Sequence, residues 1–354
     1  MNKQDGMNYA PKGKPQPVVQ PGEFIIAAAC LDHGHIYGMC NGLTEAGATL
    51  KWVYDADPAK VDKFAQQFPQ VQIADSLETI LADCEVQLVA GAAIPSERCA
   101  LGLKVMAAGK DYFTDKAPLT TLDQLDAAKV MCAKTGRKYA VYYSERLHVE
   151  SAVFAGQLVE QGAIGQVVQT LGTGPHREGT GRPDWFYQRR YFGGILCDIG
   201  SHQIEQFLFY TGNSDARVVA SQVRNFRHPH YPQFEDFGDA MLAGENGATG
   251  YFRCDWFTPD GLSTWGDGRM TLLGTDGYIE IRKYADLTHN QQDVVYLVNN
   301  DGEFRYAVNG QVGFPFFGQL IKDCLHRTEH AMTQEHAFKA AELCVKAQML
   351  ANAQ

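Results

Sequence analysis

Between Glu23 and Tyr143 the sequence alternates short apolar runs of β type with longer segments of helical period. The runs are EFIIAAAC, LKWVYDA, VQLVAGAA, KDYFTDK and KYAVYY, and the helical segments between them are 36–46, 58–68, 96–108 and 121–135. Runs that are apolar on both faces and separated by helices are typical of parallel strands buried between two helical layers. Residues 23–145 therefore predict a doubly wound α/β domain of the Rossmann type.

The pattern changes after Glu145 and predicts a second domain over residues 146–354. A helical segment at 147–161 precedes the strand-like run GQVVQTLGTG and a helix from about His202 to Tyr210. The next strands are expected at 216–224, 237–244, 247–257, 269–274, 277–283, 293–299 and 303–308, followed by helices at 315–327 and 333–351. Successive strands with hairpin signals such as NNDGE indicate an α+β domain with a large, open, mostly antiparallel sheet. The polar, proline-bearing residues 1–22 are expected to form an extended N-terminal arm.

The composition of the chain disfavours several classes of partner. The chain has 354 residues, which suits two domains, and its 31 Lys+Arg against 41 Asp+Glu give a formal charge of -10. This charge disfavours nucleic acid and anionic membranes as partners. No apolar run approaches the roughly 20 residues that span a bilayer. The nine cysteines form no C-x-x-C pair and are odd in number, as expected for reduced thiols in a cytoplasmic protein.

The loop after the first strand, ACLDHGHIYG, is where a doubly wound sheet would bind a nucleotide. The dinucleotide fingerprint G-x-G-x-x-G would fall on Ala29, Leu31 and Gly34, so only its third glycine is present. Asp55 ends the second strand 21 residues after Gly34, where a carboxylate binds the ribose hydroxyls of NAD and repels the 2'-phosphate of NADP. The alternative is that Asp55 caps the helix that begins after Pro58.

His33 and His35 form an H-x-H pair in the same loop. Such a pair could bind a metal ion, but on a loop that enters a helix it fits better as a wall of the pyrophosphate site. We therefore expect no metal.

Two segments carry a resemblance to a known family. AGKDYFTDKAPLTT resembles the AGKHVxxEKP segment of the Gfo/Idh/MocA oxidoreductases, and GGILCDIGSHQIE resembles their GGGxxxDxGxHxxD segment. The resemblance covers about residues 23–352. It implies an NAD(P)-bound Rossmann domain, a second domain with an open sheet, and oxidation or reduction of a hydroxyl or keto group on sugars, inositols or related polyols. It also implies a homodimer or homotetramer formed through that sheet.

The same resemblance assigns Lys116, Asp198 and His202 to the family's active-site lysine, aspartate and histidine. The sequence departs from the family at the glycine fingerprint and at E-K-P, which is Asp115-Lys116-Ala117-Pro118 here.

These residue types suit hydride transfer from an alcohol, because the hydroxyl proton must leave with the hydride. His202 can accept that proton, since histidine titrates near pH 6.5 when unperturbed. Asp198, four positions earlier and just before the helix, can orient the ring, and Lys116 can stabilise the developing alkoxide. Gly193 and Gly194 would let the backbone turn beside the nicotinamide. Alternatively, Asp198 is a helix N-cap and His202 a buried core histidine.

The loop GPHREGTGRPDWFYQRRYF concentrates arginines and aromatic residues in an otherwise acidic chain. Aromatic faces bind sugar rings and arginines bind hydroxyls or carboxylates, so His176, Arg177, Arg182 and Trp185 are expected to bind substrate. The alternative is a solvated surface loop whose arginines form ordinary ion pairs. At the end of the last Rossmann strand, Tyr143 and Arg146 could line the cleft, or Glu145-Arg146 could form an ion pair at the hinge between domains.

We therefore expect an NAD-dependent dehydrogenase acting on a CH–OH group of a sugar, polyol or sugar acid. A glycosidase that keeps NAD bound and uses transient oxidation and elimination is the main alternative, and a non-catalytic binding protein is another. The expected catalytic residues are Lys116, Asp198 and His202, and the expected substrate-binding residues are His176, Arg177, Arg182, Trp185, Tyr143 and Arg146. The expected cofactor-binding residues are Leu31, Asp32, His33, Gly34, His35, Asp55, Ala93, Ile94, Asp115 and Lys116.

Overall fold

The computed structural model describes residue 11 and residues 13–353, which form two compact units. The parallel-sheet unit comprises residues 14–142 and 314–338, and the mixed-sheet unit comprises residues 143–313 together with the chain from 339 onward. The segment 314–338 thus belongs with the first unit, although it lies far along the chain. In the described part of the chain, no helix is both long and apolar enough to cross a membrane.

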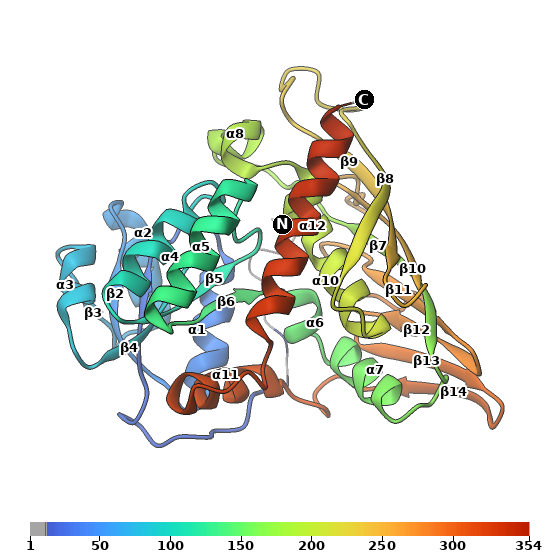
Figure 1. Cartoon of the computed structure of the whole chain (residues 1–354), viewed down its shortest axis with the longest axis horizontal. Coiled ribbons are helices and arrows are strands. Elements are labelled where there is room, and N and C mark those ends of the chain that lie inside the picture. Colours follow the sequence, from blue (N-terminus) through green and yellow to red (C-terminus); the bar gives the residue numbers. More distant parts are fainter. Residues whose placement is uncertain (1–10, 12, 354) are drawn as a thin grey trace. The chain divides into compact units, whose positions relative to one another are not determined.

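The parallel-sheet unit contains six parallel strands in the order β3-β2-β1-β4-β5-β6. The strands are β1 (Ile25–Ala29), β2 (Thr49–Tyr54), β3 (Gln72–Ile73), β4 (Val86–Gly91), β5 (Asp111–Asp115) and β6 (Tyr139–Tyr142). The helices are α1 (His35–Glu45), α2 (Pro58–Gln67), α3 (Leu77–Ala82), α4 (Arg98–Ala107), α5 (Leu122–Thr135) and α11 (Pro315–His326). Helices cover both faces of the sheet (Figure 1), which confirms the doubly wound fold.

Local sequence explains where several of these helices begin and end. The side chain of Asp57 accepts a hydrogen bond from the backbone N–H of Ala59 at the start of α2, and Pro58 occupies the first turn. Thr121 caps α5 in the same way, and Gly136 ends that helix in the left-handed conformation. β3 was not predicted, because its two exposed residues form no apolar run.

Residues 14–22 of the expected arm run along the parallel-sheet unit. The backbone N–H of Val18 donates to the carbonyl of Ala46, and that of Gly22 donates to the hydroxyl of Thr49. Residues 1–10 and 12 of the expected arm lie outside the described residues.

The mixed-sheet unit contains eight strands in the order β14-β13-β12-β11-β7-β10-β9-β8, in which only the β7–β10 pair is parallel. The strands are β7 (Val167–Pro175), β8 (Ala216–Arg224), β9 (Phe237–Gly244), β10 (Thr249–Asp255), β11 (Arg269–Gly274), β12 (Gly277–Arg282), β13 (Val294–Asn299) and β14 (Gly302–Ala307). This confirms the predicted open, mostly antiparallel sheet.

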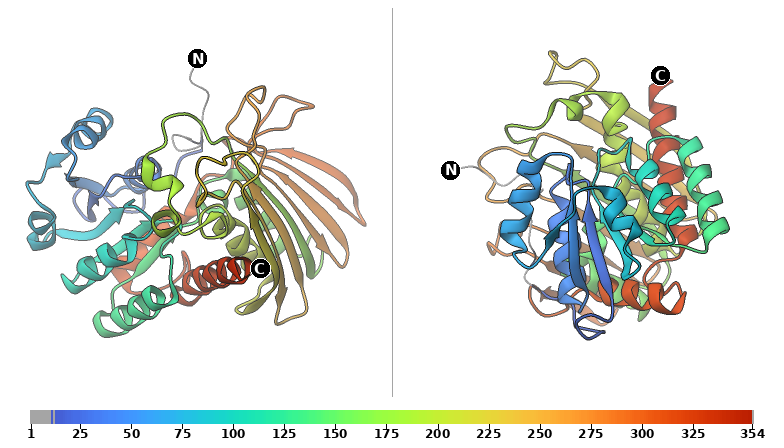
Figure 2. Two further views of the ribbon diagram at one scale, coloured as in Figure 1. Left: turned by 90° about the horizontal axis from the view of Figure 1, so that it is seen from above. Right: turned by 90° about the vertical axis from the view of Figure 1, so that its left-hand side faces the viewer.

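One face of this sheet is covered by α7 (Glu150–Glu160), α9 (Ile195–Asp198) and α10 (Gly200–Thr211), and Figure 2 shows the twisted sheet beside them. The unit also contains α6 (Ser144–Leu147), η1 (Asp184–Tyr187), α8 (Arg189–Phe192) and most of α12 (Gln334–Asn352). Side chains that point to the covered face, such as Phe252 and Leu272, are buried, whereas the opposite face exposes Leu171 and Tyr251. This alternation follows from the two-residue period of a strand.

Candidate active site

The loop between β1 and α1 is tied to the ends of the neighbouring strands. The backbone N–H of Cys30 donates to Tyr54 at the end of β2, and the carbonyl of Cys30 accepts the N–H of Ala92 just after β4. The N–H of His33 then donates to the carbonyl of Ala92. Cys30 has a φ of 58°, a left-handed conformation that glycine adopts most readily. Backbone hydrogen bonds therefore fix the conformation of this loop, although it lacks the first two glycines of the fingerprint.

Asp55 lies at the carboxyl end of β2 and holds the same loop. Its Oδ2 accepts the N–H of Leu31 at 2.5 Å, and its Oδ1 accepts the N–H of Asp57 at 2.8 Å. The alternative that Asp55 caps α2 is wrong, because Asp57 is the capping residue. Lys60 Nζ lies 2.6 Å from Asp32 and 3.8 Å from Asp55, so one ammonium faces two carboxylates.

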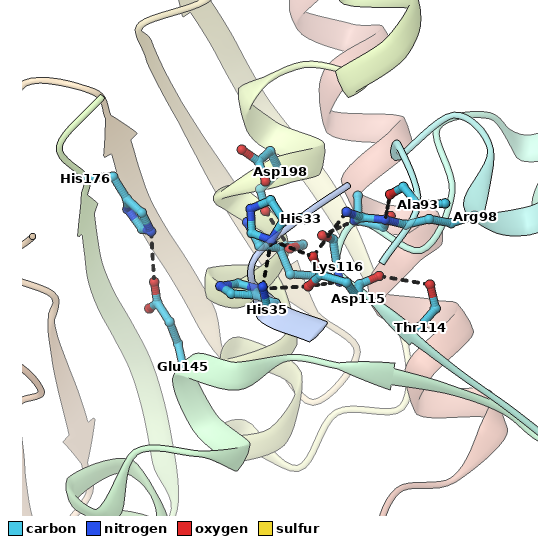
Figure 3. A network of polar contacts seen from close by, with 12 residues as sticks. His33, His35, Ala93, Arg98, Thr114, Asp115, Lys116, Glu145, His176 and Asp198 are labelled. Carbon is cyan, nitrogen blue, oxygen red and sulfur yellow. Dashed lines mark hydrogen bonds and ion pairs between the residues drawn. The ribbon is translucent and has the colours of Figure 1, made fainter. Parts of the chain in front are cut away.

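The two loop histidines converge on Asp115, the last residue of β5 (Figure 3). Nδ1 of His33 lies 3.0 Å from one oxygen of Asp115, and Nδ1 of His35 lies 2.8 Å from the other. Arg98 Nη2 lies 3.1 Å from the same carboxylate, which is fully buried. Burial raises the pKa of Asp115, but His35, Arg98 and His33 outweigh this effect and hold it well below its ordinary value. Burial lowers the pKa of His33 to about 3, so its ring is neutral at pH 7.

Ligand atoms of His33, His35 and Asp115 lie within 4.8 Å of one another, close enough to hold a metal ion. Arg98 already supplies the positive charge that balances the Asp115 carboxylate, and both rings already face its oxygens. We therefore interpret the cluster as a hydrogen-bonded support for the loop.

Lys116 follows β5 directly and is buried, with 4% of its surface exposed. The peptide bond between Lys116 and Ala117 is cis. Arg98 donates to the carbonyls of both residues, and its Nε donates to the carbonyl of Ala93 at 2.7 Å. The carbonyl of Ile94 accepts the N–H of Glu97, so this segment is also ordered by the start of α4. Arg98 is a residue that the sequence did not single out, because an arginine at a helix start is usually solvent-exposed.

In the mixed-sheet unit, Asp198 and His202 lie on two successive helices. Asp198 is the last residue of α9, and α10 begins at Gly200. Ile199 between them is also helical, so Asp198 lies inside a nearly continuous helix and not merely before one. Their spacing of four residues places both side chains on one helical face. His202 is 2% exposed.

The turn that precedes α9 depends on Gly193 and Gly194, whose φ values are 83° and 102°. A Cβ on Gly194 would lie 2.1 Å from Oε1 of Gln348, a residue of α12. Within the mixed-sheet unit, the lack of a side chain at Gly194 therefore allows its backbone to approach Gln348 closely. Gln348 also accepts the N–H of Leu196 and donates to Glu235, which in turn accepts the N–H of Ile195 at 2.8 Å.

A buried polar cluster centres on Glu145, just after β6. Its Oε2 accepts hydrogen bonds from Lys283 at 2.6 Å and from Gln203 at 3.1 Å, and its Oε1 lies 4.0 Å from Nε2 of His176 (Figure 3). Glu145 is 2% exposed and Lys283 is fully buried. Burial raises the pKa of Glu145, but Lys283, His202 and His176 outweigh this effect and lower it to about 2. The cluster is therefore anionic at Glu145 and lies beside His202.

The expected substrate loop contains both buried and partly buried side chains. Arg177 is buried and donates to the carbonyls of Pro259 and Leu262, so its guanidinium supports the neighbouring loop. Arg182 stacks over the rings of Phe186 and Trp256 at 4.4 and 4.5 Å. Trp185 is partly buried within η1.

A row of aromatic rings crosses the end of the mixed sheet. The ring of His176 lies 5.4 Å from Trp256 and 4.4 Å from Trp265, and Trp265 lies 4.3 Å from Tyr284. Of these residues, only His176 was singled out from the sequence, because the other three lie in separate strands or loops of unremarkable pattern.

Tyr143 and Arg146 have contacts inside the mixed-sheet unit. Tyr143 is fully buried, and this burial raises the pKa of its hydroxyl well above the ordinary value. Arg146 Nε donates to Glu205 at 2.7 Å, and its guanidinium stacks over Phe209. The ion pair of Arg146 is thus made to α10 of its own unit.

Sequence comparison matches both halves of the chain to models of one family. Residues 36–143 match the GFO/IDH/MocA oxidoreductase family with its NAD-binding Rossmann fold, and residues 153–280 match the GFO/IDH/MocA C-terminal domain. A D-xylose dehydrogenase of Paenarthrobacter nicotinovorans is 26% identical over 153 residues. That match covers 41% of this chain and 38% of the dehydrogenase, well under half of its length.

Solved structures share the fold over most of the chain. One from Erwinia carotovora atroseptica SCRI1043, assigned to the oxidoreductases, is 59% identical with a TM-score of 0.91 and covers 93% of this chain and 99% of its own. Levoglucosan dehydrogenase in complex with NADH and levoglucosan is 16% identical, with a TM-score of 0.76 and coverage of 93% and 97%. Aldose-aldose oxidoreductase from Caulobacter crescentus, complexed with glycerol, is 18% identical with a TM-score of 0.77 and coverage of 94% and 98%.

Proposed function

We propose that this chain, which belongs to the Gfo/Idh/MocA family of oxidoreductases, is an NAD-dependent dehydrogenase that acts on a CH–OH group of a sugar, polyol or sugar acid. The observation that carries the proposal is the hydrogen bond that the carboxylate of Asp55 accepts from the N–H of Leu31, in the loop after β1. It joins the two elements that recognise a dinucleotide in a doubly wound sheet, the ribose-binding carboxylate and the pyrophosphate loop.

The residues at the carboxyl ends of β1 and β2 fit NAD. Each carboxylate oxygen of Asp55 accepts one backbone N–H, which leaves acceptor capacity for ribose hydroxyls. Asp32 and Asp55 share the single ammonium of Lys60, so this corner carries more negative than positive charge. A 2'-phosphate would be repelled there, which favours NAD over NADP. Gly34 is the N-cap residue of α1, whose N-terminus favours the pyrophosphate.

When bound, NAD would accept a hydride from the substrate carbon. In this proposal His202 accepts the hydroxyl proton and Asp198 orients the imidazole. Lys116 donates a hydrogen bond to the substrate oxygen, and the backbone around it is held by Arg98 and Asp115. Glu145, paired with Lys283, supplies a fixed negative charge beside His202 that stabilises the imidazolium form.

A carbohydrate substrate is supported by the relatives. The fold is shared with levoglucosan dehydrogenase and with aldose-aldose oxidoreductase, and part of the sequence is similar to a D-xylose dehydrogenase. His176 and the arginine-aromatic stack of Arg182 on Trp256 suit a ring that carries hydroxyls.

A homodimer or homotetramer through the open sheet face is part of the proposal. Adjacent strands expose Leu171, Met241 and Tyr251 side by side, and Leu273 and Tyr278 form a second cross-strand pair. Contiguous exposed apolar side chains on a sheet are typical of an interface.

The nine cysteines, all free, support a reducing, cytoplasmic location.

The test is NADH formation by the full chain incubated with NAD and a panel of aldoses, polyols, sugar acids and aryl glycosides, with NADP in parallel. The proposal expects free NADH with at least one compound that bears a CH–OH group. Release of the aryl group without free NADH would instead identify a glycosidase. No turnover of any compound, with NAD bound, would favour a binding protein.

A further inference from the structure

The loops at one end of the mixed sheet enclose a groove of about 550 Å³. It lies where β12 and β14 end and β13 begins, and it is lined from three stretches of chain around Thr264, Tyr284–Gln292 and Asn309. This volume lies within the roughly 300–1,000 Å³ of small-molecule sites. None of the residues that line the groove belongs to a sequence motif described above.

One wall of the groove is fixed by a buried carboxylate. Asp286 is 1% exposed and accepts hydrogen bonds from the hydroxyl of Tyr296 at 2.9 Å and from Arg305 at 3.1 Å. Asp286 also accepts the N–H of Thr288, and its carboxylate lies 2.9 Å from Nδ1 of His289. These contacts hold the loop that carries Asp286 in one conformation.

Two further buried carboxylates fix the chain around Asn309, which also lines the groove. Glu150 accepts the N–H groups of Val312 and Gly313 at 2.7 and 2.6 Å. Asp293 accepts the side-chain amide of Asn309 at 2.9 Å. Both carboxylates are 1% exposed. The groove is therefore preorganised, which reduces the conformational entropy that its loops lose when a ligand binds.

The lining is polar but carries little charge. It consists largely of hydroxyl and amide side chains, namely Ser263, Thr264, Asn290, Gln291, Gln292, Asn309 and Gln311. Among the described residues that line it there is no lysine or arginine, and its carboxylate, Asp286, is satisfied by the donors named above. Carboxylate or phosphate ligands need cationic partners, so the lining suits a neutral molecule with several hydroxyls.

The groove adjoins the polar cluster around Glu145. Lys283 donates to Glu145, and the next residue, Tyr284, lines the groove. The aromatic row also links them, since the ring of Tyr284 contacts Trp265 and Trp265 contacts His176.

We propose that this groove is an accessory saccharide subsite, which binds a second, neutral sugar unit of the substrate. The enzyme then prefers a disaccharide or longer glycoside to a free monosaccharide. This inference rests on the proposed function, because it extends the substrate site of the same dehydrogenase.

The experiment measures binding of glucose, maltose, cellobiose and lactose to the full chain by saturation-transfer NMR and calorimetry. We expect at least one disaccharide to bind about 10-fold more tightly than glucose, a difference of about 1.4 kcal/mol. Gln292→Ala removes one amide, and Ser263→Trp fills part of the groove. Both are expected to abolish this preference, whereas Gln161→Ala, an exposed amide after α7, is expected to retain it.

Equal binding of glucose and all three disaccharides, no disaccharide binding, or a preference that survives both groove variants would overturn the subsite. NADH formation separates the two proposals. A disaccharide preference that depends on the groove, without NADH from any sugar, contradicts the dehydrogenase and leaves the subsite standing. NADH formation from sugars without any preference for disaccharides would contradict the subsite and leave the dehydrogenase standing.

Discussion

The carboxylate of Asp55 accepts the backbone N–H of Leu31 at 2.5 Å, which joins the end of β2 to the loop after β1. In a fingerprint with three glycines, the glycines themselves give this loop its shape. Here a side chain takes part of that role, so Asp55 is expected both to hold the loop and to bind ribose.

Replacement of Asp55 by asparagine is expected to weaken NAD binding by about 10- to 100-fold, because a hydrogen bond to a charged group contributes about 1.5–3 kcal/mol. The discrimination against NADP should fall at the same time. Fluorescence titration with both cofactors measures these effects. Asp57→Asn, which alters only the cap of α2, serves as the matched control and should keep the preference. Unchanged NAD affinity in Asp55→Asn would remove this residue from the ribose site.

His202→Ala is expected to slow hydride transfer by at least about 100-fold, the lower end of what a positioned general base contributes. Asp198→Asn should slow it less, because that residue only orients the ring. NAD affinity should change little in both variants, and His326→Ala, at the exposed end of α11, is the control. Single-turnover kinetics with a substrate found in the panel provide the measurement. A folded His202→Ala enzyme with a near-normal rate would return His202 to the role of a core histidine.

Breaking the Glu145–Lys283 pair on one side should be costly. Glu145→Gln leaves a buried ammonium without its counter-ion and is expected to lower the free energy of unfolding by about 3–5 kcal/mol. The double variant Glu145→Gln/Lys283→Met should recover part of this loss, since neither charge then remains buried. Urea unfolding of the three proteins tests the prediction, and equal stability of wild type and Glu145→Gln would show that the pair contributes nothing.

The same pair predicts a dependence of stability on pH. The folded pKa of Glu145, about 2, lies below its ordinary value of 4.5. The stabilisation from this group is thus complete above pH 4.5 and is lost as the pH falls toward 2. Urea unfolding from pH 6 to pH 3 should therefore show a steeper loss of stability in the wild type than in the double variant. Parallel curves would contradict the assignment.

Gly194→Ala is expected to destabilise the protein by more than about 2 kcal/mol. A left-handed non-glycine residue costs about 1–2 kcal/mol, and the new methyl group would meet Gln348 at 2.1 Å. Gly212→Ala is the comparison variant, since its φ of 67° is also positive but its Cβ position has open space around it. In thermal unfolding, the larger loss expected for Gly194→Ala reports its backbone conformation (φ 102°, ψ 158°) together with the contact with Gln348, and equal losses in the two variants would contradict the prediction.

Much of the fold could be predicted because it depends on local pattern. The predicted strands at 216–224, 237–244 and 269–274 coincide with β8, β9 and β11, since alternation and apolar runs are properties of neighbouring residues. The edge strand β3 carries no such signal. The loop after β1 and Asp55 could be located by spacing from the strands, because parallel strands end at one edge of the sheet, whereas Lys116 was assigned through the family resemblance.

The charged supports of the site could not be predicted in this way. Arg98 and Lys283 belong to residue types that are normally exposed, and both are buried only because of distant partners. Glu145 and Lys283 are separated by 138 residues, and no periodicity links them. The roles of Lys116, Asp198 and His202 stay predictions until the variants above are measured.

The contact of Gln348 with the turn at Gly194 also bears on the order in which the chain can fold during synthesis. A growing chain that has reached residue 340 contains all of α9 and α10, but it lacks the side chain that holds Leu196 and Glu235 in place. The turn at Gly194 and α9, which lead into the helix that carries His202, therefore gain this contact only when α12 has left the ribosome. A ribosome stalled before Gln348 should display a mixed-sheet unit whose residues 193–198 are cut by protease much faster than those of the released protein.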